Sequence, residues 1–319
     1  MNQYITWLDS SEGTSAARVG GKGASLARLG GAGFPVPPGF GVTVDAYHAF
    51  HRSLGLDEVL GPLAAQSGRP TPAEVREACG PLLARLEGAS LPAEVSGAIA
   101  TSFAELEGRA GPGATFAVRS SGVSEDGAGA SFAGLYDSYI NLTGEEAVLR
   151  AVLECYHCLW QPRAAHYRTI KGIDHRKEAM AVVIMQTVPS FVSGVAFTLN
   201  PVTGATDEVL INASWGLGEA IVSGMVTPDN YCVRKTGEIL HHDVFDKTIR
   251  VVPIPGGTEK QDTPRGLATA PALTGDQIRT VAETAARVET HYGCPMDIEF
   301  AFDERGRFYL LQARPITTR

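Results

Sequence analysis

The chain has 319 residues, of which 44% are hydrophobic and 8% aromatic, and its formal net charge is −8. This length and apolar content suffice for one large or two ordinary folded domains. The acidic balance and the lack of a basic stripe argue against a nucleic-acid-binding protein, although local cations can still attract a small anion.

The sequence also bears on the compartment and on the thiols. It has no run of about 18 apolar residues, and its first residues, MNQYITWLDS, lack the basic and apolar regions of a secretory signal. The 5 cysteines are odd in number and scattered, and Cys155 and Cys158 share a helical pattern without the second ligand pair of a zinc site. We therefore expect a cytoplasmic protein with reduced thiols and no membrane span.

The first motif is GGKGASLARLGGAGFPVPPGFG, residues 20–41. Glycines and Lys22 precede a short helix-like segment, ASLARL, and a Gly/Pro turn follows it. Lys22 therefore lies near a helix N-terminus, where the helix dipole and the lysine both favour an anion. The motif is not a Walker loop, because Gly23 rather than Ser or Thr follows the lysine. The alternative is an ordinary solvated lysine.

Further helices are predicted on either side of residue 116. Residues 71–108 indicate two packing helices, the first with the capping-box pattern of Thr71 and Glu74. Thr143 with Glu146 predicts the start of another helix. These helices carry little chemistry.

The stretch Phe116–Leu142, FAVRSSGVSEDGAGASFAGLYDSYINL, is typical of a phosphate-handling loop. Its first three residues predict a buried strand, and Arg119 follows where that strand must end. A guanidinium there can hold phosphate oxygens through two parallel hydrogen bonds. Residues 127–134, GAGASFAG, are nearly all small, so their N–H groups can approach an anion or cover it as a lid. The alternative is a Gly/Ser hairpin with a surface arginine.

From residue 180 the pattern changes to short strands, MAVVIMQ, SGVAFTL and DEVLINA, which indicate a sheet-rich second half. Residues 252–272 are rich in Pro, Gly and Thr and predict an exposed connection. Thr274 with Gln277 predicts a capped helix after it.

The chain closes with a predicted hairpin of DIEFAFD and RFYLLQA. Strand alternation places Asp297 and Glu299 on one face and apolar residues on the other, and Gln312 and Arg314 share a parity. If these polar sides meet, carboxylate and amide oxygens form a hard site suited to Mg²⁺, with Arg314 beside it for phosphate. The alternative is a polar face that meets only water.

Five of these motifs together resemble the ATP-grasp nucleotide-binding domain of the phosphoenolpyruvate synthase, pyruvate phosphate dikinase and rifampicin phosphotransferase group. They are GGKGASLARL with GFPVPPGF, FAVRSSGVSEDGAGASFAG, SGVAFTLNP, ASWGLGEAIVSG with TPDNY, and PMDIEFA with LLQARPIT. The resemblance covers essentially the whole chain. It implies an α+β ATP-grasp fold with two α/β lobes, residues 1–186 and 187–319, a nucleotide cleft between them, and a helical insert at about 71–108.

The resemblance also implies roles for particular residues. The expected nucleotide-binding residues are Lys22, Arg119, Ser138, Gln186, Asp297, Glu299, Gln312 and Arg314. Among them, Lys22, Arg119 and Arg314 are the expected catalytic cations, and Glu299 and Gln312 the expected Mg²⁺ ligands. Phosphoryl transfer needs such positioned cations and metal against spreading negative charge.

Three features depart from the family pattern. Met185 stands where the hinge strand often carries Gln, and strand alternation turns the neighbouring Gln186 away. Leu135 stands at the Gln position of the FAGQ sequence. No Thr-Ser-His or Ser-His acceptor motif and no barrel for pyruvate occur in the chain.

The implied activity is that of a Mg-ATP-dependent phosphotransferase of dikinase type. Such an enzyme moves the β-phosphoryl group of ATP to a histidine on a separate domain or protein, for onward transfer to pyruvate or another small molecule such as an antibiotic, and releases AMP and phosphate. The expected partners are ATP, that histidine domain and a small-molecule acceptor. Two alternatives remain: a module that binds ATP without turnover, and an ATP-grasp kinase or ligase that acts directly on a small molecule.

Overall fold

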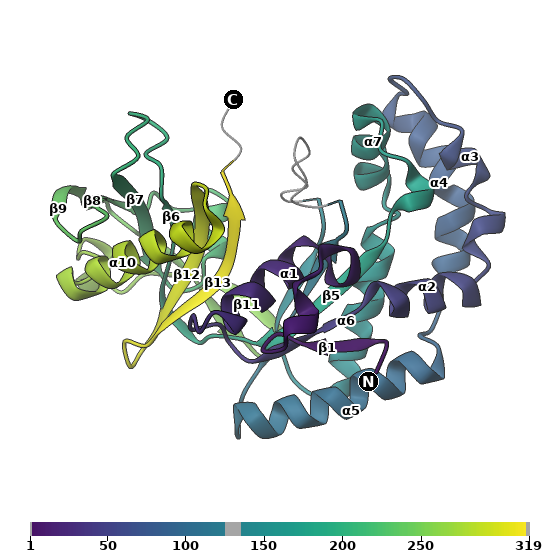
Figure 1. The fold of residues 1–319 in the computed structure, drawn as a ribbon, viewed down its shortest axis with the longest axis horizontal. Coiled ribbons are helices and arrows are strands. Elements are labelled where there is room, and N and C mark those ends of the chain that lie inside the picture. The colour runs from purple at the N-terminus through teal and green to yellow at the C-terminus, as the bar shows by residue number, and fades with distance from the viewer. Residues whose placement is uncertain (1, 125–134, 317–319) are drawn as a thin grey trace. The chain divides into compact units, whose positions relative to one another are not determined.

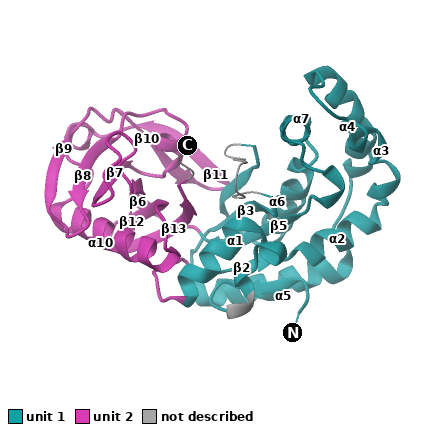
Figure 2. Cartoon of the chain, turned by 45° about the horizontal axis from the view of Figure 1, so that its top comes forward, with its two compact units in different colours: residues 1–31, 38–186 teal, residues 32–37, 187–319 magenta. Residues whose placement is uncertain are grey.

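The computed structural model describes residues 2–124 and 135–316, and it divides the chain into two compact units (Figure 1, Figure 2). Unit 1 is residues 1–31 and 38–186, and unit 2 is residues 32–37 and 187–319. The short segment 32–37, which the sequence analysis placed in the first lobe, thus belongs to the second unit. Each unit combines helices with β-sheet, so the predicted α+β class is confirmed.

Unit 1 is built on a five-stranded sheet in the order β1-β2-β5-β3-β4. Its strands are β1 (Ile5–Trp7), β2 (Gly39–Val42), β3 (Phe116–Gly122), β4 (Ser138–Leu142) and β5 (Met180–Gln186). Its helices are η1 (Ser11–Thr14), α1 (Ala16–Gly31), α2 (Val44–Ser53), η2 (Leu56–Glu58), α3 (Gly61–Ala64), α4 (Pro72–Leu86), α5 (Ala93–Ala110), α6 (Glu145–Cys158), α7 (Pro162–Lys171) and η3 (His175–Lys177).

Helices cover both faces of this sheet. On one face α1 packs against β5, where Gly23 approaches Val183, and on the other face α5 packs against β3 through the edge-to-face rings of Phe103 and Phe116. The first six residues of β5 are all buried, which explains why its sequence is a continuous apolar run rather than an alternating one.

The helix α1 approaches the end of β3 very closely. It is longer than the ASLARL segment that the sequence predicted, and it is interrupted at Gly20, whose φ is 68° and ψ 176°. A Cβ there would lie 2.0 Å from the carbonyl oxygen of Ser121, so only glycine fits. The Ser121 hydroxyl donates to the Val19 oxygen (2.8 Å) and accepts from the Gly23 N–H (3.1 Å). The interruption therefore ties α1 to β3 through backbone groups that an unbroken helix would have used internally.

The predicted helix starts were only partly right. The capping box of Thr71 and Glu74 at α4 is confirmed, because the hydroxyl accepts from the Glu74 N–H and the Glu74 carboxylate accepts from the Thr71 N–H. The start predicted from Thr143 and Glu146 was wrong. The N-cap of α6 is Gly144, at φ 78°, and it makes no side-chain cap. This positive φ suits glycine, so the backbone turn between β4 and α6 sets the helix start instead.

Unit 2 contains a six-stranded antiparallel sheet in the order β13-β12-β6-β7-β8-β9 and a separate pair, β10-β11. Its strands are β6 (Ser190–Phe197), β7 (Glu208–Trp215), β8 (Asp229–Arg234), β9 (Ile239–Asp243), β10 (Ile249–Ile254), β11 (Gly257–Asp262), β12 (Met296–Asp303) and β13 (Phe308–Pro315). Its helices are α8 (Glu219–Val222), α9 (Arg265–Ala268) and α10 (Gly275–Tyr292).

The connection predicted over residues 252–272 was wrong in part, because it contains the end of β10, all of β11 and α9. The prediction rested on Pro253, Gly256 and Gly257, residue types that usually interrupt strands. On its other side β10 makes an isolated bridge, from Val251 to Gly216, two residues before Pro253. Pro253 is compatible with the hairpin because it lies next to the end of β10, where a missing N–H costs little.

One face of the six-stranded sheet packs against α10, whose predicted capping box of Thr274 and Gln277 is confirmed. The sheet residues that alternation assigned to the apolar face are all buried: Ile298, Phe300 and Phe302. The opposite face carries Asp297 and Glu299, as the pattern predicted.

Residues 32–37, which we call the strap, complete unit 2 at its β13 edge. The Leu310 N–H donates to the Pro35 oxygen (2.9 Å). The buried Phe34 ring lies 4.9 Å from the Arg287 guanidinium and 6.0 Å from the His291 ring, both on α10. Because of the strap, the chain passes between the two units three times, after residues 31, 37 and 186.

Candidate functional site

The first group of predicted site residues lies on the unit 1 sheet. In the antiparallel register Arg119 on β3 is opposite Ser138 on β4 and Val183 on β5. Directly opposed residues share a face of the sheet, so Arg119 and Ser138 stand side by side on the face that α1 covers. Arg119 is half-buried and Ser138 is exposed.

Lys22 reaches the same corner of unit 1 from α1. Its Nζ donates to the carbonyl oxygen of Ser120, the residue after Arg119, at 3.1 Å. Lys22 comes two residues after the interruption at Gly20, so the close approach of α1 to β3 sets its position. The Ser120 hydroxyl in turn donates to the Asp137 oxygen (2.7 Å), which joins the β3 and β4 sides of the corner. The prediction that the strand ends at Arg119 was wrong, because β3 continues to Gly122 and Arg119 is at its middle. Lys22 and Arg119 therefore converge in the second half of β3, an arrangement that a polyphosphate would stabilise.

Gln186 lies apart from this group. In the β3-β5 register it is opposite Phe116, on the face covered by α5, whereas Met185 is opposite Ala117 and shares the face of Arg119. This placement agrees with the expectation from strand alternation. The predicted glycine lid, residues 127–134, lies outside the described residues.

The second group of predicted residues lies on β12 and β13 of unit 2. Asp297 is opposite Arg314, and Glu299 is opposite Gln312. The register shifts directly after Glu299, so that Leu310 rather than Leu311 is opposite Phe300. This bulge lets Gln312 share the polar face while Leu310 returns to the buried apolar face.

An ion pair orients the arginine of this second group. Both Nε and Nη2 of Arg314 lie 2.8 Å from Oδ2 of Asp297. The Asp297 carboxylate is nearly buried, whereas about a third of the Arg314 side chain is exposed, so the pair contributes little to stability. Its effect is to hold the guanidinium beside Glu299 and Gln312.

The pairing of Glu299 with Gln312 fits a magnesium ion. Their donors are carboxylate and amide oxygens, the hard ligands that Mg²⁺ takes, and Gln312 is only 4% exposed. The described residues include no cluster of three His, Cys, Asp or Glu side chains that would hold a metal unaided. A magnesium ion at this pair would thus need further ligands, as expected where water and phosphate oxygens complete the shell.

Sequence analysis missed two residues at these sites. Ser121 was given no role of its own, although its hydroxyl anchors α1. Asn212 lies on the same sheet face as Glu299, because both are opposite Val195 in the register, and its amide donates to Asn230. The alternation in DEVLINA contained the signal for Asn212, whereas the role of Ser121 depends on a contact with a distant helix.

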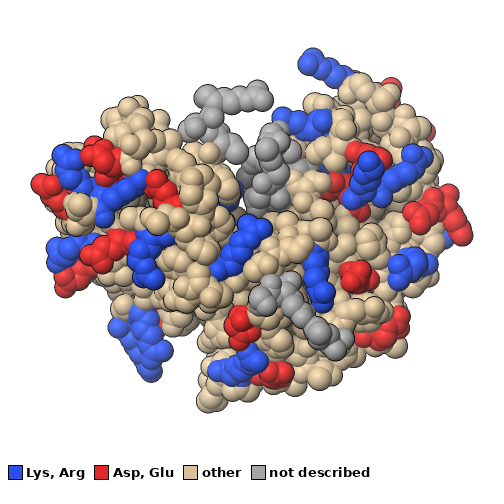
Figure 3. Space-filling view, in the orientation of Figure 1, with Lys and Arg blue, Asp and Glu red and all other residues tan. Residues whose placement is uncertain are grey.

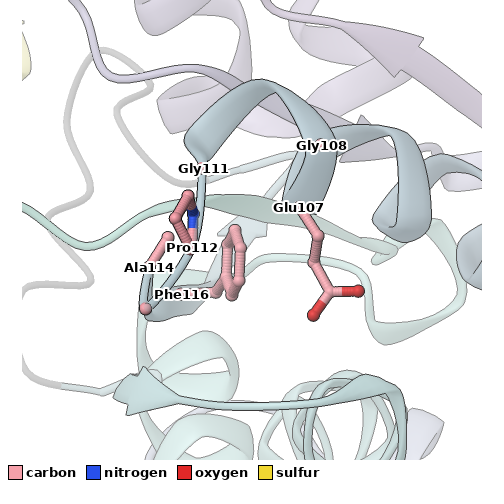
Figure 4. Close-up of a pocket in the computed structure, with 7 residues that line it drawn as sticks. Glu107, Gly108, Gly111, Pro112, Ala114 and Phe116 are labelled. Carbon is pink, nitrogen blue, oxygen red and sulfur yellow. The ribbon is translucent and has the colours of Figure 1, made fainter.

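A pocket of about 350 Å³ lies at the end of α5, between its last turn and the start of β3 (Figure 4). It is lined by Glu107, Gly108, Gly111, Pro112, Gly113, Ala114 and Phe116. Its lining includes a carboxylate and no cation, so it does not suit a phosphate. On the face drawn in Figure 3, acidic and basic side chains are interspersed rather than gathered by sign. No helix in the described ranges has the length and apolarity needed to cross a bilayer.

Residues 16–319 match the family model described as the AMP/ATP-binding domain of pyruvate phosphate dikinase. The chain belongs to this family. A probable phosphoenolpyruvate synthase of Methanocaldococcus jannaschii is 41% identical over 99% of this chain and 27% of its own length, and that of Methanothermobacter thermautotrophicus is 38% identical over 100% and 46%. A rifampicin phosphotransferase of a Streptomyces species is 39% identical over 99% and 36%. The resemblance inferred from the motifs is confirmed, and the chain spans between about a quarter and a half of these relatives.

Proposed function

We propose that this chain is the nucleotide-binding part of a dikinase-type phosphotransferase, with its two units as the lobes of an ATP-grasp fold. It binds Mg-ATP and moves the β-phosphoryl group to a histidine outside this chain, from which the group passes to pyruvate or another small molecule. AMP and phosphate are the other products. Membership of the AMP/ATP-binding family supports the nucleotide, and the names of the relatives support the class of reaction.

The observation that carries this proposal is the sorting of charges between the two groups. In unit 1, Lys22 and Arg119 converge in the second half of β3. In unit 2, the register pairs Glu299 with Gln312, and an ion pair holds Arg314 beside them. Cations for phosphate and oxygens for a metal are what phosphoryl transfer requires of a protein.

Each residue then has a definite task. Lys22 and Arg119 bind phosphate oxygens, and Arg119 stabilises the charge that spreads over the transferred group. Glu299 and Gln312 hold the magnesium ion, which neutralises phosphate charge when bound. Arg314 binds phosphate in the orientation that Asp297 gives it.

The two remaining nucleotide-binding predictions differ in strength. The Ser138 hydroxyl lies beside Arg119 and can bind the same phosphate or the ribose. Gln186 stays a prediction that its place in the register does not favour.

Product analysis tests the proposal. The chain is incubated with Mg-ATP, with and without a histidine-bearing domain taken from one of the longer relatives, and nucleotides are separated by ion exchange. We expect ATP binding and slow turnover of the chain alone, and AMP with phosphorylated histidine when the domain is added. ADP as the product would indicate a direct kinase or ligase, and binding without turnover under both conditions would indicate a nucleotide-binding module.

A further inference from the structure

We call Lys22, Arg119 and Ser138 of unit 1 the phosphate corner. A buried cluster of ionisable side chains lies beside it. The cluster consists of Arg168 on α7, His175 in η3 and Glu178, two residues before the start of β5. Arg168 is 0% exposed and Glu178 is 4% exposed. Burying such groups is costly, and well-packed apolar side chains often serve stability as well, so the cluster calls for a reason other than packing.

All three nitrogens of the Arg168 guanidinium donate hydrogen bonds. Nη2 donates to the Leu159 oxygen (2.7 Å) and Nε to Nδ1 of His175 (3.3 Å). Nη1 donates to the hydroxyl of Tyr136 (3.3 Å). Tyr136 comes two residues before Ser138, so a buried charge fixes the chain just ahead of β4.

Glu178 makes the equivalent contact on the β3 side. Its Oε1 accepts a hydrogen bond from the hydroxyl of Ser124, and the neighbouring backbone is paired as well, Val123 N–H to the Ala179 oxygen at 3.2 Å. Burial raises the pKa of Glu178, while the Ser124 hydrogen bond and the charge of Arg168 act in the opposite direction. Ser124 comes five residues after Arg119, so the chain is fixed just beyond β3.

The two hydroxyls thus hold the described chain on either side of residues 125–134. We propose that Arg168 and Glu178 are positioning residues for the phosphate corner, because they fix Tyr136 and Ser124 and through them the ends of β4 and β3. The bond from Ser120 to Asp137 lies between these two anchors and Arg119, so it transmits the placement to the arginine. The expected effect on ATP rests on the proposed function, whereas the effect on the backbone does not.

The test removes each hydroxyl without removing its packing. The variants are Ser124→Ala, Tyr136→Phe and the double variant, with Ser124→Thr to restore a hydroxyl. The matched controls are Ser102→Ala on α5 and Tyr156→Phe on α6, whose buried hydroxyl has no hydrogen-bond partner in the part of the chain that the structure describes. Three quantities are measured: hydrogen exchange at the amides of Ser120 and Val123, the dissociation constant of Mg-ATP, and Tm.

We expect exchange at these two amides to accelerate about tenfold in each single variant, and more in the double variant, because the backbone there opens locally. The dissociation constant of Mg-ATP rises about five- to tenfold, Ser124→Thr restores it, and Tm falls no further than in the controls. Unchanged exchange in the double variant overturns the inference. Accelerated exchange in a chain whose parent binds no ATP would retain the anchors and reject the proposed function instead.

Discussion

In the proposed function, Arg119 meets the charge of the transferred phosphoryl group mainly in the transition state, so we expect its loss to affect the rate more than the binding. We expect Arg119→Ala to lower phosphoryl transfer by roughly 10³-fold or more, by analogy with arginines that stabilise such transition states. Arg119→Lys recovers little, because an ammonium keeps the charge and loses the two-pronged contact. The measurement is the transfer rate with the histidine domain, alongside ATP affinity and Tm, and the exposed Arg150→Ala is the control. Near-normal transfer by Arg119→Ala would leave this half-buried arginine without a role in transfer.

Glu299 is the one carboxylate of the predicted magnesium pair. We expect Glu299→Ala to abolish the magnesium-dependent part of ATP binding, because Gln312 alone offers a single neutral oxygen. Calorimetric titration of ATP with and without Mg²⁺ measures this difference. Glu304→Ala, in the exposed turn of the same hairpin, should leave it unchanged. Equal magnesium dependence in Glu299→Ala and the parent would remove Glu299 from the metal site.

His175 makes the stability of unit 1 depend on pH. Burial, and secondarily the charge of Arg168, lower its pKa to about 4, and its Nδ1 accepts from Arg168. The unfolded chain takes up the same proton near pH 6.5. Between these values the unfolded state binds more protons, so stability falls as the pH is lowered through this window. Urea unfolding at pH 7.5 and at pH 5 should differ by on the order of 2 kcal/mol from this group alone.

The control for this pH effect compares how steeply the unfolding free energy depends on pH in two histidine variants and in the parent. His175→Gln should flatten the dependence of the unfolding free energy on pH, whatever its effect on stability at pH 7.5. The exposed His241→Gln should keep the parental slope. A parental slope in His175→Gln would show that other groups set it.

At the scale of elements, the interruption of α1 is the feature most sensitive to substitution. We expect Gly20→Ala to destabilise the protein by more than about 2 kcal/mol, because the new Cβ would meet the Ser121 backbone and the residue is at positive φ. ATP affinity should fall as well, since Lys22 follows this turn. Gly80→Ala in α4, where a Cβ meets nothing within 4 Å, should instead stabilise by about 0.5–1 kcal/mol. Chemical denaturation of both variants measures the contrast.

The elements that the sequence predicted well are those whose signals are local. Both capping boxes and the closing hairpin follow from side chains a few residues apart, and alternation alone put Glu299 on the polar face. The interruption at Gly20 and the bulge after Glu299 were not predictable in this way. The interruption depends on the contact of Gly20 with Ser121, which is about 100 residues away in the sequence. The bulge accompanies the burial of Leu310 on the neighbouring strand. A glycine-rich sequence by itself indicates only freedom to bend.

At the scale of the whole molecule, unit 2 is not a continuous stretch of sequence. A fragment of residues 187–319 lacks the strap, and with it Phe34 and the bond from Leu310 to Pro35. We expect unit 2 to be less stable in this fragment than in the full chain, because the loss of a buried aromatic side chain costs about 3–5 kcal/mol of unfolding free energy. Hydrogen exchange at amides of β13 measures the difference, and Phe34→Ala in the full chain should reproduce most of it. Equal protection of these amides from exchange in the fragment and in the full chain would show that the strap does not stabilise unit 2.

The strap also sets an order of events during synthesis. Residues 32–37 emerge from the ribosome long before Arg287, His291 and Leu310, the residues that later receive them. All strands of the unit 1 sheet have been made by residue 186, so that sheet can pair while Phe34 is still without its contacts. The nascent chain thus carries an exposed aromatic loop between two elements of a folded unit, and unit 2 closes only when its last strand arrives.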